Sequence, residues 1–229
     1  MAGTPELQET REMELTVSAG SELIIDVGAG SLSVEGDSQT GTVRVIAEIW
    51  QVSANDDYTL ALERHGENGA RLEAHTGSGF GSGNDRIDLV VHAPESLRVR
   101  IDDGSGSMAV RSLTGDLDIR DGSGSIRVES IGGNVTIEDG SGSLRTDNIA
   151  GNLSIDDGSG SIGIQGTGGD VHIDDGSGSI TVQRTAGTVT VSDGSGSIEV
   201  DGAEDFRLLE DGSGSVSVTG LRRGDGGDG

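Results

Sequence analysis

The second half of the chain alternates apolar and polar residues in a strictly periodic way. Apolar residues stand four and two positions before a recurring Asp-Gly-Ser-Gly-Ser motif, and five and seven positions after it. Alternation of this kind is typical of strands that bury one face. Each repeat therefore predicts two short strands joined by the motif. The motif begins at seven aspartates, each 18 residues after the last: Asp103, Asp121, Asp139, Asp157, Asp175, Asp193 and Asp211.

A looser connection returns the chain to the next repeat and carries one further apolar residue, as at Leu113, Ile131 and Ile149. Frequent glycine and the lack of apolar spacing near 3.6 residues exclude helices. Connections of equal length favour coils that stack in parallel register. The prediction is an all-β fold, a right-handed parallel β-solenoid (β-helix) with 18-residue coils, the hand following from the crossover preference of parallel strands. A contour of roughly 60 Å per coil allows two facing sheets or a flattened triangle.

The first part of the chain is related but less regular. Residues 24–36 form a degenerate repeat, IIDVGAGSLSVEG, with Val27 in the place of the aspartate. Longer alternating segments such as TVRVIAEIWQV and RIDLVVHAP predict strands separated by polar turns. We expect a polar leader at 1–13, an irregular N-terminal β-solenoid or capping region at 14–95, a regular solenoid of seven repeats with a C-terminal cap at 96–223, and a Gly/Asp tail at 224–229.

The last repeat departs from the pattern in a way that suits the end of a solenoid. Counting back four positions from Asp211 gives Arg207, where the other repeats have valine or leucine, and Phe206 lies beside it. A charged, irregular coil hinders an open strand edge from recruiting further strands. This coil is therefore the expected C-terminal cap.

The amino-acid composition limits the kinds of partner that the chain can bind. A hydrophobic content of 31% with a net charge of −25 would ordinarily indicate disorder, but stacked repeats can share a core that no single repeat builds. All 15 basic residues are arginine, and so acidic a chain argues against binding nucleic acid or anionic lipid surfaces. The absence of cysteine excludes disulfides and thiolate metal sites. No apolar run reaches the ~20 residues of a membrane span.

The segments GSLSVEG and DLVVHAPESLRVRIDDGSGSMAV, followed by G-x-V-x-I-x-D-G-S-G-S-I repeats, resemble the putative adhesin family of bacterial and archaeal β-solenoid proteins. The resemblance covers roughly residues 14 to 220. It implies a right-handed β-solenoid without established catalysis, exported to the periplasm, cell surface or exterior, and it supplies no functional residues to carry over. Because the N-terminus lacks a signal-peptide core, the signal peptide is expected to be absent from this sequence.

A tight loop of Asp, Gly and Ser could bind a metal ion, bind a phosphate group, or form a sharp turn of the backbone. Stacking would place the seven motif aspartates ~4.8 Å apart in a column, which makes them the candidate ligands for Ca²⁺; no other cofactor is expected. The loop lacks the bidentate Glu of an EF-hand, and only one turn per coil carries Asp. Alternatively, each carboxylate accepts backbone N–H groups of its own turn, and glycine supplies positive φ. A phosphate loop would occur once, precede a helix and use Lys or Arg.

No catalytic grouping is evident, because His65, His75, His92 and His172 are scattered along the chain. The expected function is that of a non-enzymatic structural or adhesin-like surface protein. Two alternatives remain: a cation- or carbohydrate-binding module that uses the acidic loop edge, and a self-assembling, fibre-forming protein. The expected partners are an unknown surface ligand or glycan, or a second copy of the chain.

Overall fold

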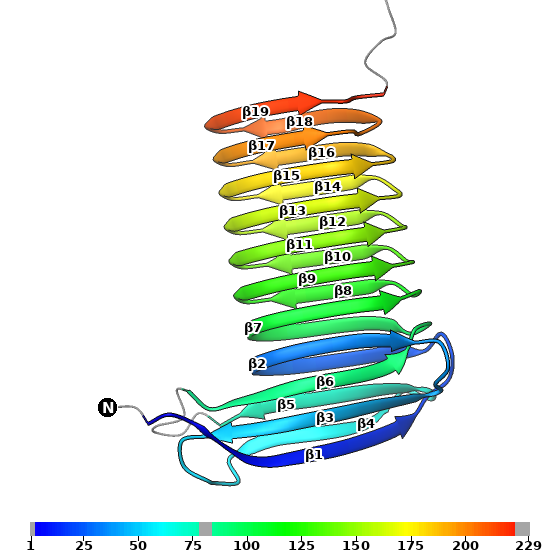
Figure 1. The fold of residues 1–229 in the computed structure, drawn as a ribbon, viewed down its shortest axis with the longest axis vertical. Coiled ribbons are helices and arrows are strands. Elements are labelled where there is room, and N and C mark those ends of the chain that lie inside the picture. The colour runs from blue at the N-terminus through cyan, green and yellow to red at the C-terminus, as the bar shows by residue number, and fades with distance from the viewer. Residues whose placement is uncertain (1–2, 78–83, 223–229) are drawn as a thin grey trace, which may run out of the picture.

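The computed structural model describes residues 3–77 and 84–222, and every regular element in these ranges is a β-strand. Figure 1 shows a column of stacked coils that stands on a broader N-terminal sheet. Among the described residues, no helix is long and apolar enough to cross a membrane. The expected tail at 224–229 lies outside the described residues. The strands of the N-terminal region and the first coil are β1 (Glu6–Thr16), β2 (Glu22–Asp37), β3 (Thr42–Gln51), β4 (Tyr58–His65), β5 (Gly69–Thr76), β6 (Arg86–Pro94) and β7 (Arg98–Leu113).

Each regular coil places one strand on each of two facing sheets. Face 1 holds the strands that precede the Asp-Gly-Ser-Gly-Ser corner, and face 2 holds those that follow it. After β7, which contributes to both, face 1 contains β8 (Leu117–Asp121), β10 (Val135–Asp139), β12 (Leu153–Asp157), β14 (Val171–Asp175), β16 (Thr188–Asp193) and β18 (Asp205–Asp211). Face 2 contains β9 (Gly124–Ile131), β11 (Gly142–Ile149), β13 (Gly160–Thr167), β15 (Gly178–Thr185), β17 (Gly196–Asp201) and β19 (Gly214–Thr219).

The period of the sequence sets the register of the stack. Equivalent positions of successive coils pair in parallel, so that Ile137 lies between Ile119 and Ile155. Every second side chain points inward, and these side chains form one continuous apolar core. The return connection adds a further buried column, occupied by residues such as Ile131. The predicted all-β, parallel β-solenoid with 18-residue coils is therefore confirmed, with two facing sheets as its cross-section.

The two corners of a coil have different backbone requirements. At the Asp-Gly-Ser-Gly-Ser corner the second glycine has a positive φ, 148° at Gly160, and a Cβ there would lie 1.9 Å from the carbonyl oxygen of Gly142 one coil below. Only glycine fits this stacked position. At the return corner one residue per coil is left-handed, and here non-glycine residues such as Ser130 (φ 59°) and Arg184 (φ 57°) also occur.

The N-terminal region inserts β2 between strands that follow it in the sequence. β2 pairs in parallel with β7 along its length, and with β5 and β6 on its other edge. Figure 1 shows the blue β2 between β7 and β6. The degenerate repeat is confirmed, because Val27 pairs with Asp103. Below β2 the strands become antiparallel: β3 pairs with β6 and with β1, and β4 pairs with β5. This is the less regular β region that the sequence predicts.

Two expectations about the ends need correction. Residues 6–13, expected in a polar leader at 1–13, instead belong to β1, an edge strand that pairs in antiparallel orientation with β3 and whose side chains are mostly exposed. In the last coil, a register shift between Val191 and Ser192 places Phe206 opposite Val189, so that Arg207 points outward. Arg207 therefore does not occupy the apolar column.

Candidate functional site

The first six motif aspartates point into the protein. Val99, Ile101 and Asp103 alternate with outward residues along β7, and the same spacing repeats in each coil. The Asp column is the stack of six buried side chains with exposed fractions between 2% and 7%. Asp211 pairs with Asp193 through the backbone and continues the register. The column consists of Asp103, Asp121, Asp139, Asp157, Asp175 and Asp193.

Each carboxylate of the Asp column uses its two oxygens differently. Oδ1 accepts the backbone N–H of the serine two positions later, at 3.2 Å from Ser105 in the first coil and 3.0 Å from Ser195 in the last. Oδ2 is buried and has no hydrogen-bond partner among the described residues. One oxygen of each carboxylate thus accepts a backbone N–H of its own turn, as predicted, and the other oxygen is unpaired inside the protein.

The surroundings of the column favour the neutral carboxyl form. Burial, followed by repulsion from Asp121, raises the pKa of Asp103 to about 7, although the amides of Ser105 and Gly104 act in the opposite direction. Burial likewise raises the pKa of Asp175 to about 6. Two like charges about 4.8 Å apart repel by roughly 3 kcal/mol at an effective dielectric constant of about 20. Full ionisation of the stack would therefore cost stability.

Outside the column, face 1 carries an acidic ledge. Asp102, Glu138 and Asp156 border a shallow depression of about 480 Å³, together with Arg120, and its floor reaches the column residues Asp103, Asp121 and Asp139. The guanidinium of Arg120 binds Glu138 at 3.1 Å, which partly neutralises the ledge. Among the described residues, no three acidic or histidine side chains gather as a metal-binding group. Calcium binding by the motif aspartates stays a prediction.

A groove of about 510 Å³ crosses face 2 where the N-terminal sheet meets the first coils. Its outward row contains the small or apolar side chains of Val90, Ser33 and Ala109, which pair across β6, β2 and β7. Val90 is 40% exposed although it is a large aliphatic residue. These short side chains leave the surface recessed between taller neighbours.

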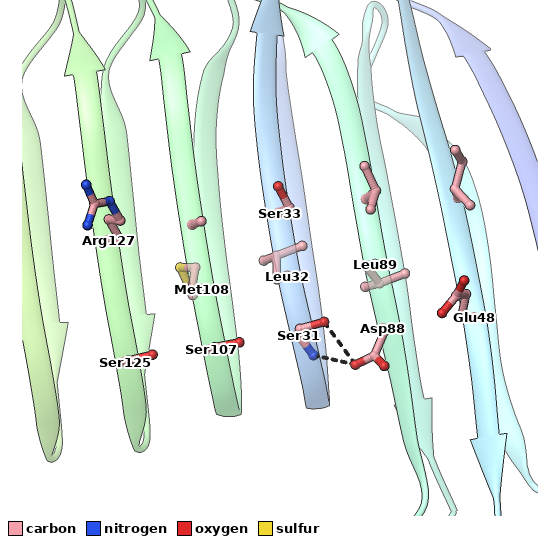
Figure 2. Close-up of a pocket in the computed structure, with 13 residues that line it drawn as sticks. Ser31, Leu32, Ser33, Glu48, Asp88, Leu89, Ser107, Met108, Ser125 and Arg127 are labelled. Carbon is pink, nitrogen blue, oxygen red and sulfur yellow. Dashed lines mark hydrogen bonds between the residues drawn. The ribbon is translucent and has the colours of Figure 1, made fainter. Parts of the chain in front are cut away.

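The two ends of the groove carry opposite charge. Figure 2 shows Arg127 on β9 at one end and Glu48 on β3 at the other. Asp88 lies near Glu48, where its Oδ1 accepts the backbone N–H of Ser31 at 2.8 Å and the Ser31 hydroxyl at 3.0 Å. Arg127 donates to Glu129 at 2.7 Å. Sequence reasoning missed this groove, because its strands are distant along the chain.

The four histidines lie at separate places on the surface of the described residues. His75 lies 2.9 Å from Asp26, and His92 lies 3.9 Å from Glu35, in partly exposed ion pairs of the N-terminal region. His172 is exposed on face 1. None of the hydrogen bonds between described residues joins a histidine to a serine hydroxyl.

Comparison with known proteins yields a shared fold. No family model and no curated protein matches the chain. The crystal structure of a putative adhesin from Bacteroides fragilis aligns with a TM-score of 0.61 at 11% identity, over 93% of this chain and 97% of that one. A putative cell adhesion protein from Clostridium sporogenes aligns with a TM-score of 0.45 at 10% identity, over 92% and 99% of the two chains. A putative lipid binding protein from Parabacteroides distasonis gives 0.46 at 15% identity, over 92% and 96%.

Proposed function

We propose that the chain is a non-enzymatic, adhesin-like β-solenoid protein, exported or displayed at the cell surface, that binds a glycan through the groove on face 2. The groove carries the proposal because it combines an apolar recess with groups of opposite charge at its two ends, Arg127 and Glu48. A second depression of about 470 Å³ lies on the same face over the regular coils, where Arg145 is its only charged lining residue among those described. The shared fold with the Bacteroides fragilis protein, described as a putative adhesin, agrees with this role. The rigid stack would hold the groove on a stiff support.

The chemistry of the groove suits a sugar chain. Serine hydroxyls such as those of Ser33 and Ser107 both donate and accept hydrogen bonds, as sugar hydroxyls do. Glu48 supplies acceptors and Arg127 donors at the two ends, while Val90 offers an apolar surface to C–H groups. The volume of about 510 Å³ falls within the usual range of ligand sites. Five strands separated by about 4.8 Å give the groove a length of roughly 19 Å.

A glycan array tests the proposal with three variants. Ala109→Arg fills the recess and should reduce binding at least tenfold, and Arg127→Ala should weaken binding by removing the donors at one end. Arg145→Ala is the matched control, because Arg145 pairs with Arg127 one coil further along and does not line the groove. Absence of any bound glycan, or equal binding by Ala109→Arg and the wild type, would contradict the proposal.

Self-association is a second candidate, favoured by the end of the stack. In the described part of the chain, β19 pairs with β17 and has no strand on its other side. Leu208, Leu209 and Val216 are 38%, 61% and 38% exposed there. Open strand edges with apolar side chains favour pairing with another chain. Sedimentation across a concentration series distinguishes this candidate, because a single monomeric species at all concentrations would exclude it.

A further inference from the structure

The Asp column is a set of carboxyl groups that each keep one oxygen unpaired inside the protein. Asp157, Asp175 and Asp193 are all 2% exposed, and their Oδ2 atoms have no partner among the described residues. A charged oxygen in this setting loses its hydration without receiving a replacement hydrogen bond. The column therefore needs a neutralising partner that the side chains around it do not supply.

The groups that face the column add negative charge or none. Along the stack, each neighbour is another aspartate of the column, and Val27 takes the equivalent position below Asp103. Asp102, Asp156 and Asp174 contribute further repulsion from the adjacent outward positions. The interior beside the column is aliphatic, with residues of both faces in a single apolar cluster.

The arginine of the adjacent outward row is already engaged. Arg120 follows the core residue Ile119 and precedes Asp121, but its guanidinium binds Glu138 at 3.1 Å. It is exposed on the outer surface of face 1. Among the described residues, therefore, the arginine nearest the column in this row is directed to a surface carboxylate.

We propose that the Asp column is a proton-binding site, which takes up protons from near-neutral solution when the solenoid folds and thereby makes the fold more stable in mild acid. A proton removes the charge that burial disfavours. Neutral carboxyl groups placed between charged ones also remove the contacts between like charges along the stack. One oxygen of each group remains free to accept the backbone N–H of its own turn.

The sign of the pH dependence follows from the direction of the shifts. Burial raises the pKa of five column carboxyls, to about 7 for Asp103 and about 6 for Asp175, whereas an unfolded aspartate titrates near 3.9. Between roughly pH 4 and pH 7 the folded chain therefore holds more protons than the unfolded chain. The free energy of unfolding then increases as the pH falls through this window, and the gain is complete near pH 4.

Urea unfolding followed by circular dichroism from pH 8 to pH 5 tests the proposal. In 1 M NaCl the screening length is about 3 Å, so that repulsion between surface charges contributes little. The midpoint should rise as the pH falls. Asp157→Asn keeps the oxygen that accepts Ser159 N–H and removes the charge, so it should raise the midpoint at pH 8 and flatten the pH dependence. Asp147→Asn, at an outward position of β11 on face 2, is the matched control and should leave the slope unchanged.

A proton count provides a second readout that needs no variant. Unfolding the wild-type chain in unbuffered solution at pH 6 should release about one to two protons, as the pKa values of Asp103 and Asp175 imply. Release of no protons, or a midpoint that falls on acidification, would overturn the proposal. A midpoint at pH 8 that rises with Ca²⁺ and falls with chelator would also overturn it, because a cation would then occupy the column.

Discussion

The corner glycine Gly160 allows the stacking of the coils to be tested by the addition of one methyl group. In Gly160→Ala the new Cβ would lie 1.9 Å from the carbonyl oxygen and 2.9 Å from the carbonyl carbon of Gly142. Ordinary contacts begin at 3.4 Å, so the two coils would have to separate at this corner. The φ of 148° is also one that alanine rarely adopts.

The cost can be worked from the contacts at that corner. Backbone strain at such a φ is worth about 1–3 kcal/mol. Separation of the two coils would also weaken the hydrogen bonds from Gly142 N to Ser159 O, 3.0 Å, and from Gly158 N to Asp139 O, 2.9 Å. Each contributes roughly 0.5–1.5 kcal/mol. The expected loss in the free energy of unfolding is therefore about 2–6 kcal/mol.

Urea unfolding monitored by circular dichroism measures this loss, and Gly163→Ala provides the control in the same strand. A Cβ at Gly163 would meet only the carbonyl oxygen of Leu144, at 3.9 Å, and no positive φ is involved. That variant should be neutral or more stable by about 0.4–1 kcal/mol. If the two alanine variants differ by less than about 0.5 kcal/mol, the corner does not depend on close stacking and the reasoning is wrong.

Three further outcomes are expected. Thr146→Val should stabilise the fold by about 1–2 kcal/mol in thermal unfolding, because Thr146 is fully buried with an unpaired Oγ1, whereas exposed Thr136→Val should change little. Gly166→Ala should cost about 1 kcal/mol in urea unfolding, since Gly166 has a φ of 76° at the return corner; an unchanged midpoint would count against that reasoning. If the Asp column binds protons as proposed, calorimetric titration with millimolar Ca²⁺ at about pH 6 should give no saturable heat, because a protonated carboxyl is a poor ligand for Ca²⁺; saturable binding would favour the calcium alternative.

Much of the regular solenoid could be predicted because its register is periodic in the sequence. Identical connections leave one way of stacking, so that Ile119, Ile137 and Ile155 pair as their spacing predicts. In the last coil, counting residues back from the motif gives the wrong inward residue. Its strand contains an additional residue before Asp211, which shifts the pairing and brings Phe206 instead of Arg207 over the preceding coil. The connection before this strand is one residue shorter, so the spacing between Asp193 and Asp211 is still 18 residues and gives no indication of the shift.

The candidate sites differ in how visible they are in the sequence. The inward direction of Asp103 can be read from the sequence, because Asp103 continues the alternation of Val99 and Ile101, although its charge alone suggests a place at an acidic edge. The groove has no comparable signal. Val90 and Ala109 meet on either side of Ser33 only because β2 lies between β6 and β7, an arrangement that local periodicity does not encode.

The position of β2 divides the folding of the chain into two regimes. Pairing of β2 with β7 joins residues 76 positions apart, as in the contact between Glu35 and Arg111, so a long loop must close before the first coil is complete. Every later coil adds contacts across 18 positions, as between Asp116 and Asn134. A chain that emerges N-terminus first must therefore wait for β7 and can then wind onto it one coil at a time. Loss of a terminal coil would shorten such a molecule, whereas damage to β2 would remove the template on which all the coils grow.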